Sequence, residues 1–181
     1  MDASDFRLVG TRSVARGRFI TLERRYYATP GGRWTAREVV RHPGSAAVVL
    51  WDGERVHLVR QHRAAVGGPL LELPAGKLDV AGESPEVAAR RECIEELGLQ
   101  PGRLTLLHVG YTSPGFTDEL THIYLGENLT AAAASPQGLE EASATVVALT
   151  LDEVAAALAN GEVRDAKTIL GLCTLLRRCG R

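Results

Sequence analysis

The apolar and polar residues of the chain predict strands, then one central helix, more strands and two final helices. Residues 45–51 form an apolar run typical of a buried strand, and residues 55–60 form its partner across an Asp-Gly turn. Four further strand-like stretches occupy residues 70–73, 104–111, 120–125 and 144–149. Helical patterns follow at residues 151–159 and 165–178. This order favours an α+β fold, an α/β/α sandwich with a mixed sheet between helices.

Residues 7–42 contain a separate group of short β-prone stretches. A Thr-Pro-Gly-Gly turn signal lies at residues 29–32, and a His-Pro-Gly sequence at residues 42–44 marks the join to the main domain. We therefore expect a small antiparallel sheet in residues 1–43 and the main domain in residues 44–181. The first segment is too short to bury a core of its own.

The central helix is predicted between two capping signals. Ser84 is a good N-cap, Pro85 fits the first helical position, and Gly98 is placed to end the helix. The positions expected to pack against the rest of the domain are Val87, Ala88, Cys93, Ile94 and Leu97.

The same helix carries an acidic face. Glu92, Glu95 and Glu96 stand at i, i+3 and i+4, where like charges cost roughly 0.2–0.5 kcal/mol per pair. The last two also lie in the final turn, where the helix dipole disfavours anions by roughly 0.3–1 kcal/mol each. A divalent cation would remove both penalties, so this face is a candidate metal site.

Composition narrows the function classes. The 181 residues are 45 % apolar and 24 % charged, with a formal net charge of −1, which is ordinary for a soluble globular protein and indicates no nucleic-acid partner. No apolar run is long enough for a transmembrane helix, so no membrane partner is expected. The N-terminus has no signal-peptide pattern and the three cysteines have no metal-ligand spacing, which favours a reducing cytoplasm.

Residues 76–99 resemble the Nudix box, G-x5-E-x7-R-E-U-x-E-E-x-G-U, in which U is aliphatic. The second half matches from Glu83 through Arg91 to Leu99, whereas six residues rather than five separate Gly76 from Glu83. Residues 71–79 and 111–119 resemble the ADP-ribose pyrophosphatases (ADP-sugar diphosphatases) of that superfamily, including a proline fifteen positions after the box.

The resemblance implies a Nudix fold and magnesium-dependent hydrolysis of the diphosphate bond of ADP-ribose, giving AMP and ribose 5-phosphate. Manganese is the alternative ion. Two other functions stay open: hydrolysis of another nucleoside diphosphate sugar, and nucleotide sensing by a non-catalytic module of the same fold. In similar enzymes the N-terminal strands exchange between subunits, so the resemblance also implies a homodimer.

It further implies roles for particular residues. The implied metal ligands are the carbonyl of Ala75 and the carboxylates of Glu92, Glu95 and Glu96. Arg91 is expected to orient these carboxylates, with Glu83 as a supporting group, and Glu140 or Glu141 in a late loop to act as catalytic base. The candidates for substrate binding are Arg37, Arg63, Pro114, Gly115, Phe116 and Glu119. Phe116 or Tyr27 could stack on adenine, with core packing as the alternative.

Overall fold

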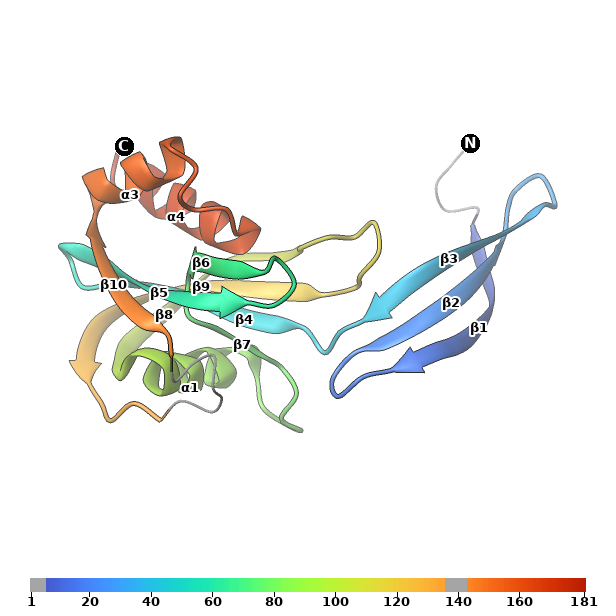
Figure 1. Cartoon of the computed structure of the whole chain (residues 1–181), viewed down its shortest axis with the longest axis horizontal. Helices are drawn as coiled ribbons and strands as arrows, with labels where there is room; N and C mark the ends of the chain where they lie inside the picture. The colour runs from blue at the N-terminus through green and yellow to red at the C-terminus, as the bar shows by residue number, and fades with distance from the viewer. Residues whose placement is uncertain (1–5, 136–142) are drawn as a thin grey trace. The chain divides into compact units, whose positions relative to one another are not determined.

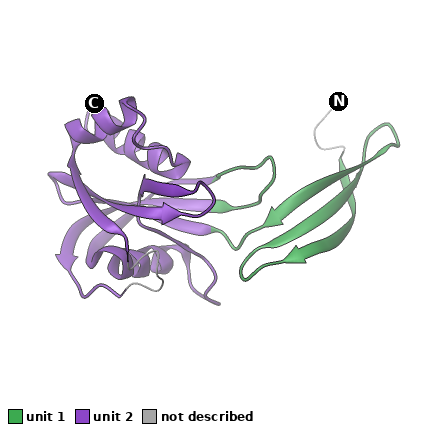
Figure 2. Cartoon of the chain, in the orientation of Figure 1, with its two compact units in different colours: residues 1–44, 111–120 green, residues 45–110, 121–181 purple. Residues whose placement is uncertain are grey.

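A computed structural model describes residues 6–135 and 143–181 (Figure 1). Contacts between residues divide the chain into two compact units (Figure 2). Unit 1 comprises residues 1–44 and 111–120, and unit 2 comprises residues 45–110 and 121–181. No helix in the described ranges is both long and apolar enough to cross a lipid bilayer.

Unit 1 is built on a three-stranded antiparallel sheet. Its strands, in the order β1-β2-β3, are β1 (Arg7–Arg16), β2 (Thr21–Ala28) and β3 (Trp34–Arg41). Residues 111–120 join β3 at Val40, whose N–H donates to Phe116 O at 2.8 Å and whose carbonyl accepts from Asp118 N–H at 3.3 Å. The predicted small antiparallel sheet is confirmed.

Unit 2 contains a sheet of seven strands. They are β4 (Ser45–Trp51), β5 (Arg55–Arg63), β6 (Gly68–Glu72), β7 (Ala75–Lys77), β8 (Leu99–Tyr111), β9 (Leu120–Ala131) and β10 (Thr145–Thr150). The strand order is β10-β5-β4-β9-β8, while β6 pairs with β5 and β7 pairs with β4. Because β4 runs parallel to β9 and antiparallel to β5 and β7, the sheet is mixed as predicted.

Three helices, α1 (Pro85–Leu97), α3 (Leu151–Ala159) and α4 (Ala166–Arg178), cover the two faces of this sheet (Figure 1). Successive side chains of β4 point to opposite faces. Ala46, Val48 and Leu50 pack in the core beneath α1, whereas Ala47 and Val49 belong to the core beneath α3 and α4. The predicted α/β/α sandwich is therefore confirmed.

The ends of α1 follow the predicted signals. The Ser84 side chain accepts a hydrogen bond from Val87 N–H, and Gly98 ends the helix in the left-handed conformation at φ 63°. The expectation that Val87 packs inward is wrong, because its side chain is 54 % exposed. The predictions for Ala88 and Cys93 are confirmed, since both are fully buried, and Ala89 is buried beside them.

The residues that follow the predicted strand at 70–73 form a further short strand. Strand β7 begins at Ala75, where Ala75 and Gly76 pair with Ala47 and Ala46 of β4. Pro74 has no N–H for a strand ladder, so it separates β6 from β7. This places a short, ordered segment of backbone beside the helix that carries the acidic face.

Candidate active site

Arg91 is the centre of the acidic cluster in unit 2. Its Nε and Nη2 donate to the two carboxylate oxygens of Glu83, at 2.9 and 3.0 Å. Its Nη1 donates to Glu92 Oε1 at 2.7 Å and to Glu95 Oε2 at 2.9 Å. The structure thus brings these four residues together, with one guanidinium between three carboxylates.

These interactions are partly shielded from solvent. The side chains of Glu83, Glu92 and Glu95 are 8 %, 11 % and 15 % exposed. The hydrogen bond from Arg91 lowers the pKa of Glu83, and the bonds to Glu83 and Glu92 raise the pKa of Arg91. Both shifts favour the charged forms of Glu83 and Arg91, so these two residues form an ion pair at neutral pH.

The acidic face of α1 meets the backbone of β7. Glu96 Oε2 accepts a hydrogen bond from Ala75 N–H at 3.2 Å. Glu92 lies directly over Gly76, since a Cβ atom placed on Gly76 would come within 1.8 Å of Glu92 Oε1. The absence of a side chain at Gly76 therefore makes room for the Glu92 carboxylate. Three of the four predicted ligand residues, Ala75, Glu92 and Glu96, therefore meet where α1 contacts β7.

The donor set fits a hard divalent cation. Within the described residues, no three His, Cys, Asp or Glu side chains are arranged to hold a metal ion by themselves. Magnesium commonly binds through one or two carboxylates together with substrate oxygens and water, so a complete protein cage is not required. The carboxylates of Glu92 and Glu96 beside the β7 backbone supply oxygen atoms only, which suits magnesium or manganese better than zinc.

A second charged cluster lies around Glu72 at the end of β6. Arg63 donates from Nε and Nη2 to the two Glu72 oxygens at 2.7 and 2.8 Å, and Lys167 Nζ donates to Glu72 Oε2 at 2.6 Å. Burial would raise the pKa of Glu72, but Arg63 and Lys167 lower it to about 2. The pKa of Arg63 is raised mainly by Glu72, and the charge of Glu96 adds to this rise.

The sequence interpretation included Arg63 but missed Glu72 and Lys167. A signal for Glu72 was present, because it is a single acidic residue inside the apolar stretch of residues 70–73. Such a residue is seldom buried without a cationic partner. That partner lies 95 residues further along the chain, where no local pattern could indicate it.

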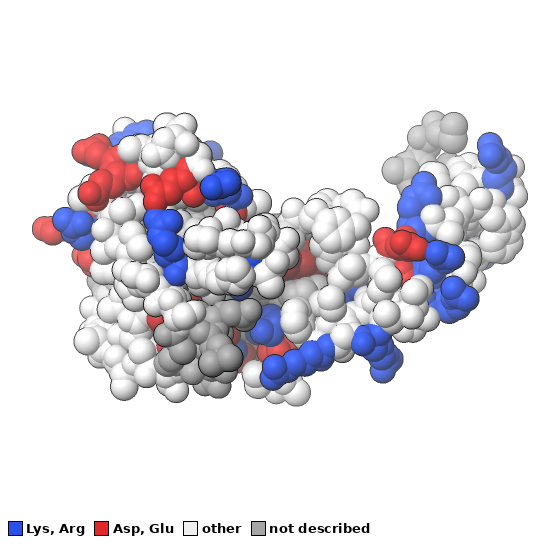
Figure 3. Space-filling view, viewed as in Figure 1, with Lys and Arg blue, Asp and Glu red and all other residues white. Residues whose placement is uncertain are grey.

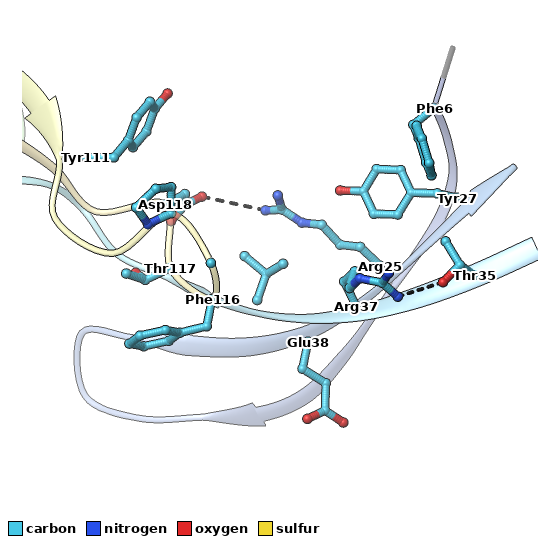
Figure 4. A pocket seen from close by; sticks show the side chains of 13 residues that line it. Phe6, Arg25, Tyr27, Thr35, Arg37, Glu38, Tyr111, Phe116, Thr117 and Asp118 are labelled. Atoms are coloured by element: carbon cyan, nitrogen blue, oxygen red, sulfur yellow. Dashed lines mark hydrogen bonds and ion pairs between the residues drawn. The ribbon is translucent and has the colours of Figure 1, made fainter. Parts of the chain in front are cut away.

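Unit 1 contains a cavity of about 530 Å³ that gathers most of the predicted substrate-binding residues. Its lining includes Tyr27, Arg37, Pro114, Gly115 and Phe116. Figure 4 shows the side chains of Tyr27, Arg37 and Phe116 around it. The Arg37 guanidinium is oriented by hydrogen bonds from Nη1 to the Thr35 hydroxyl at 2.6 Å and to the Ala36 carbonyl at 2.8 Å.

Other features of unit 1 suit an anionic ligand. Basic side chains gather on its surface (Figure 3), where residues 6–44 contain nine arginines and two glutamates. Arg25, which also lines the cavity, lies 3.6 Å from Asp118. Phe116 is 56 % exposed, so it is not a core residue.

Two predicted substrate-binding residues, Arg63 and Glu119, are not among the residues that line this cavity. Glu119 is outside the cavity lining and accepts a hydrogen bond from the Thr112 hydroxyl at 2.7 Å. Glu140 and Glu141, the two candidates for the catalytic base, fall outside the described residues.

The sheet, its helices and the acidic box on α1 define a Nudix-type domain. Residues 40–171 match the NUDIX domain family, and the chain belongs to that family. A solved structure described as an ADP compounds hydrolase shares the fold, with a TM-score of 0.85 over 97 % of this chain and 95 % of its own, at 20 % sequence identity. The resemblance drawn from the box residues is confirmed.

Several pyrophosphatases are similar to this chain in sequence. The chain is 34 % identical to an ADP-ribose pyrophosphatase of Bacillus subtilis (strain 168), over 93 % of this chain and 91 % of the relative. It is 36 % identical to an ADP-ribose pyrophosphatase of Mycobacterium tuberculosis, over 95 % and 84 %. A GDP-mannose pyrophosphatase of Citrobacter koseri is 36 % identical over 74 % of each chain.

Proposed function

We propose that this protein hydrolyses the diphosphate bond of ADP-ribose, giving AMP and ribose 5-phosphate, with magnesium held at α1. The observation that carries the proposal is the meeting of α1 with β7, where Glu92 lies over Gly76 and Glu96 accepts from Ala75 N–H. Relatives named ADP-ribose pyrophosphatase, which align over most of their length, support this choice of substrate.

In this proposal Glu92 and Glu96 are the principal metal ligands, with Glu95 and the Ala75 carbonyl assisting. Magnesium bound there would offset the negative charge of the diphosphate as water attacks it. Arg91 keeps the carboxylates in place through the hydrogen bonds described above. Arg63 presents a guanidinium fork that suits a phosphate group.

The base that accepts a proton from the attacking water is proposed to be Glu140 or Glu141. This assignment rests on the resemblance, since both residues lie outside the described ranges. Single replacement of each by Gln, assayed at saturating magnesium, distinguishes them. If neither variant slows turnover, the base is another residue.

The proposed nucleoside site is the cavity of unit 1. Arg37 could hold a phosphate or ribose oxygen, and exposed Phe116 or Tyr27 could stack on the base. Pro114 and Gly115 would shape the loop that carries Phe116. Glu119 is proposed to act indirectly, by fixing the start of this loop through Thr112.

We also propose a homodimer formed by the N-terminal strands, with residues 1–43 as the dimer-forming segment. Several apolar side chains of this segment are exposed, among them Leu8 at 50 %, Val14 at 45 % and Phe19 at 47 %. Exposed apolar side chains on these strands support an interface with a second copy of the chain. The cysteines Cys93, Cys173 and Cys179 are free thiols, which supports a reducing compartment such as the cytoplasm.

A substrate panel tests the proposed function. ADP-ribose, ADP-glucose and GDP-mannose are each incubated with the protein at fixed magnesium, and the products are separated and identified. We expect AMP and ribose 5-phosphate from ADP-ribose as the fastest reaction. The similarity to GDP-mannose pyrophosphatases supports GDP-mannose as the second candidate. Binding of a nucleotide sugar without turnover in magnesium or manganese would instead favour a sensing module.

A further inference from the structure

Glu72 is a buried carboxylate with two cationic partners from separate parts of unit 2. Its side chain is 2 % exposed, Arg63 comes from the end of β5, and Lys167 comes from the first turn of α4. The bidentate bond to Arg63 alone gives the carboxylate a counter-charge and occupies both of its oxygens. Lys167 is thus a second cationic partner of a carboxylate that Arg63 already pairs.

Of Glu72, Lys167 and Arg63, Arg63 has the most exposed side chain. Glu72 is 2 % exposed and Lys167 13 % exposed, whereas Arg63 is 39 % exposed. Glu72 engages the Nε and Nη2 atoms of Arg63. A guanidinium has five N–H donors, so this bidentate bond leaves three of them available to a ligand on the exposed side. Glu72 thus holds the inner edge of a guanidinium whose outer edge can bind an anion.

Lys167 is itself fixed at the N-terminus of α4. Its Nζ lies 2.9 Å from Asp165 Oδ2, and Asp165 caps the helix by accepting from Thr168 N–H at 3.0 Å. The Thr168 hydroxyl in turn accepts from Leu73 N–H at 2.9 Å, directly after Glu72. The first turn of α4 is thereby joined to the end of β6 at two points, one through Thr168 and one through Lys167.

We propose that Lys167 is a positioning residue that fixes Arg63, through the buried carboxylate of Glu72, in the orientation that binds the substrate diphosphate. This inference rests on the proposed function, in which Arg63 binds phosphate. Lys167 Nζ and Arg63 Nη2 share Glu72 Oε2, while Arg63 Nε holds Oε1. Without Lys167 the carboxylate can rotate, and the guanidinium rotates with it. A guanidinium held in advance loses less side-chain freedom when the substrate binds.

The Lys167→Met variant tests this role, because Met keeps much of the length of the side chain and removes the charge. We expect KM for ADP-ribose to rise about tenfold, which corresponds to about 1.4 kcal/mol, with a much smaller change in kcat. Lys167→Arg should recover most of the affinity. Arg60→Met is the matched control, since Arg60 is on the same strand as Arg63 and pairs with Glu162 instead. The control should leave KM unchanged.

A double-mutant cycle separates positioning from general destabilisation. In an Arg63→Ala background, Lys167→Met should no longer raise KM, because the guanidinium that it positions is gone. A purely structural lysine would give independent effects, so KM would rise by the same factor in both backgrounds and would follow the loss of Tm. That result would overturn the proposal.

A binding measurement keeps the inference testable if turnover is absent. The affinity for inorganic diphosphate in magnesium is measured by calorimetry for the wild type, Lys167→Met and Arg60→Met. We expect a loss of about tenfold only in Lys167→Met. Equal affinity in all three would refute the role of Lys167, whatever the substrate panel shows. Weaker binding by Lys167→Met in a protein that hydrolyses none of the nucleotide sugars would support it while refuting the proposed function.

Discussion

Replacement of Gly76 by Ala tests most directly whether the position of the Glu92 carboxylate matters for catalysis. Gly76 has no positive φ, so Ala fits the backbone there. Its Cβ, however, would come within 1.8 Å of Glu92 Oε1, 1.9 Å of Cδ and 2.4 Å of Cγ, whereas real Cβ contacts are essentially never shorter than 3.0 Å. The carboxylate must therefore move by about 1.2 Å at its nearest atom. The side chain is flexible, so we expect the fold to persist.

A displacement of about 1 Å at a catalytic group can cost about 100-fold in rate, and we expect a loss of this size in kcat/KM for ADP-ribose. The magnesium concentration that gives half-maximal rate should also rise. The matched control is Gly68→Ala in β6, where an added Cβ meets nothing within 4 Å. Both variants should unfold near the wild-type Tm. Wild-type turnover and magnesium dependence in Gly76→Ala would show that the position of Glu92 does not matter for catalysis.

Three further predictions concern charge. Arg91→Met should lower the free energy of unfolding by roughly 2 kcal/mol in EDTA and by less in excess magnesium, because a bound cation replaces the lost counter-charge. Thermal unfolding in both buffers measures the two losses, and equal losses would contradict the prediction. Because the pKa of Glu72 falls from 4.5 to about 2 on folding, its contribution, on the order of 3 kcal/mol, is present above pH 4.5 and lost as pH falls toward 2. Glu72→Gln should therefore flatten the stability–pH curve in that window, and an unchanged slope in acid denaturation would contradict it. Removal of magnesium by EDTA should abolish turnover. Glu96→Gln should lower kcat by more than about 100-fold with Tm unchanged. Normal turnover in this variant would show that Glu96 is not a metal ligand.

The sequence predicted α1 well because its signals are local. Ser84 and Gly98 act within a turn of the helix ends, and the structure shows both in their capping roles. The packed face was harder to predict, because it depends on which way the helix rests on β4. Val87 satisfies the apolar pattern of the helix and still lies on the exposed side. Local pattern alone does not fix that rotation.

Long-range partners were the main omission. Glu72 and Lys167 form one hydrogen bond of 2.6 Å across 95 residues, and neither residue has a motif of its own. Strand β7 was likewise hidden, because Ala75 and Gly76 have little strand propensity and are held by pairing with β4. The cavity residues of unit 1 could be expected only from resemblance, since Arg37 and Phe116 are 79 positions apart in the chain. In each case tertiary contacts decide what the local sequence leaves open.

In the sequence, the acidic face of α1 suggests that a bound cation is needed to offset the repulsion between its carboxylates. The structure reveals another counter-charge, because the Arg91 guanidinium bonds to Glu83, Glu92 and Glu95 at distances from 2.7 to 3.0 Å. Glu96 is held separately by Ala75 N–H. Repulsion between the carboxylates is thus relieved before any metal binds, so it is weak support for a metal site by itself. Arg91 thus bonds to three of the four carboxylates, while Glu92 and Glu96 meet the backbone of β7. The support for a metal site comes instead from the placement of oxygen ligands, because Glu92 over Gly76 and Glu96 at Ala75 N–H form a donor set that suits magnesium.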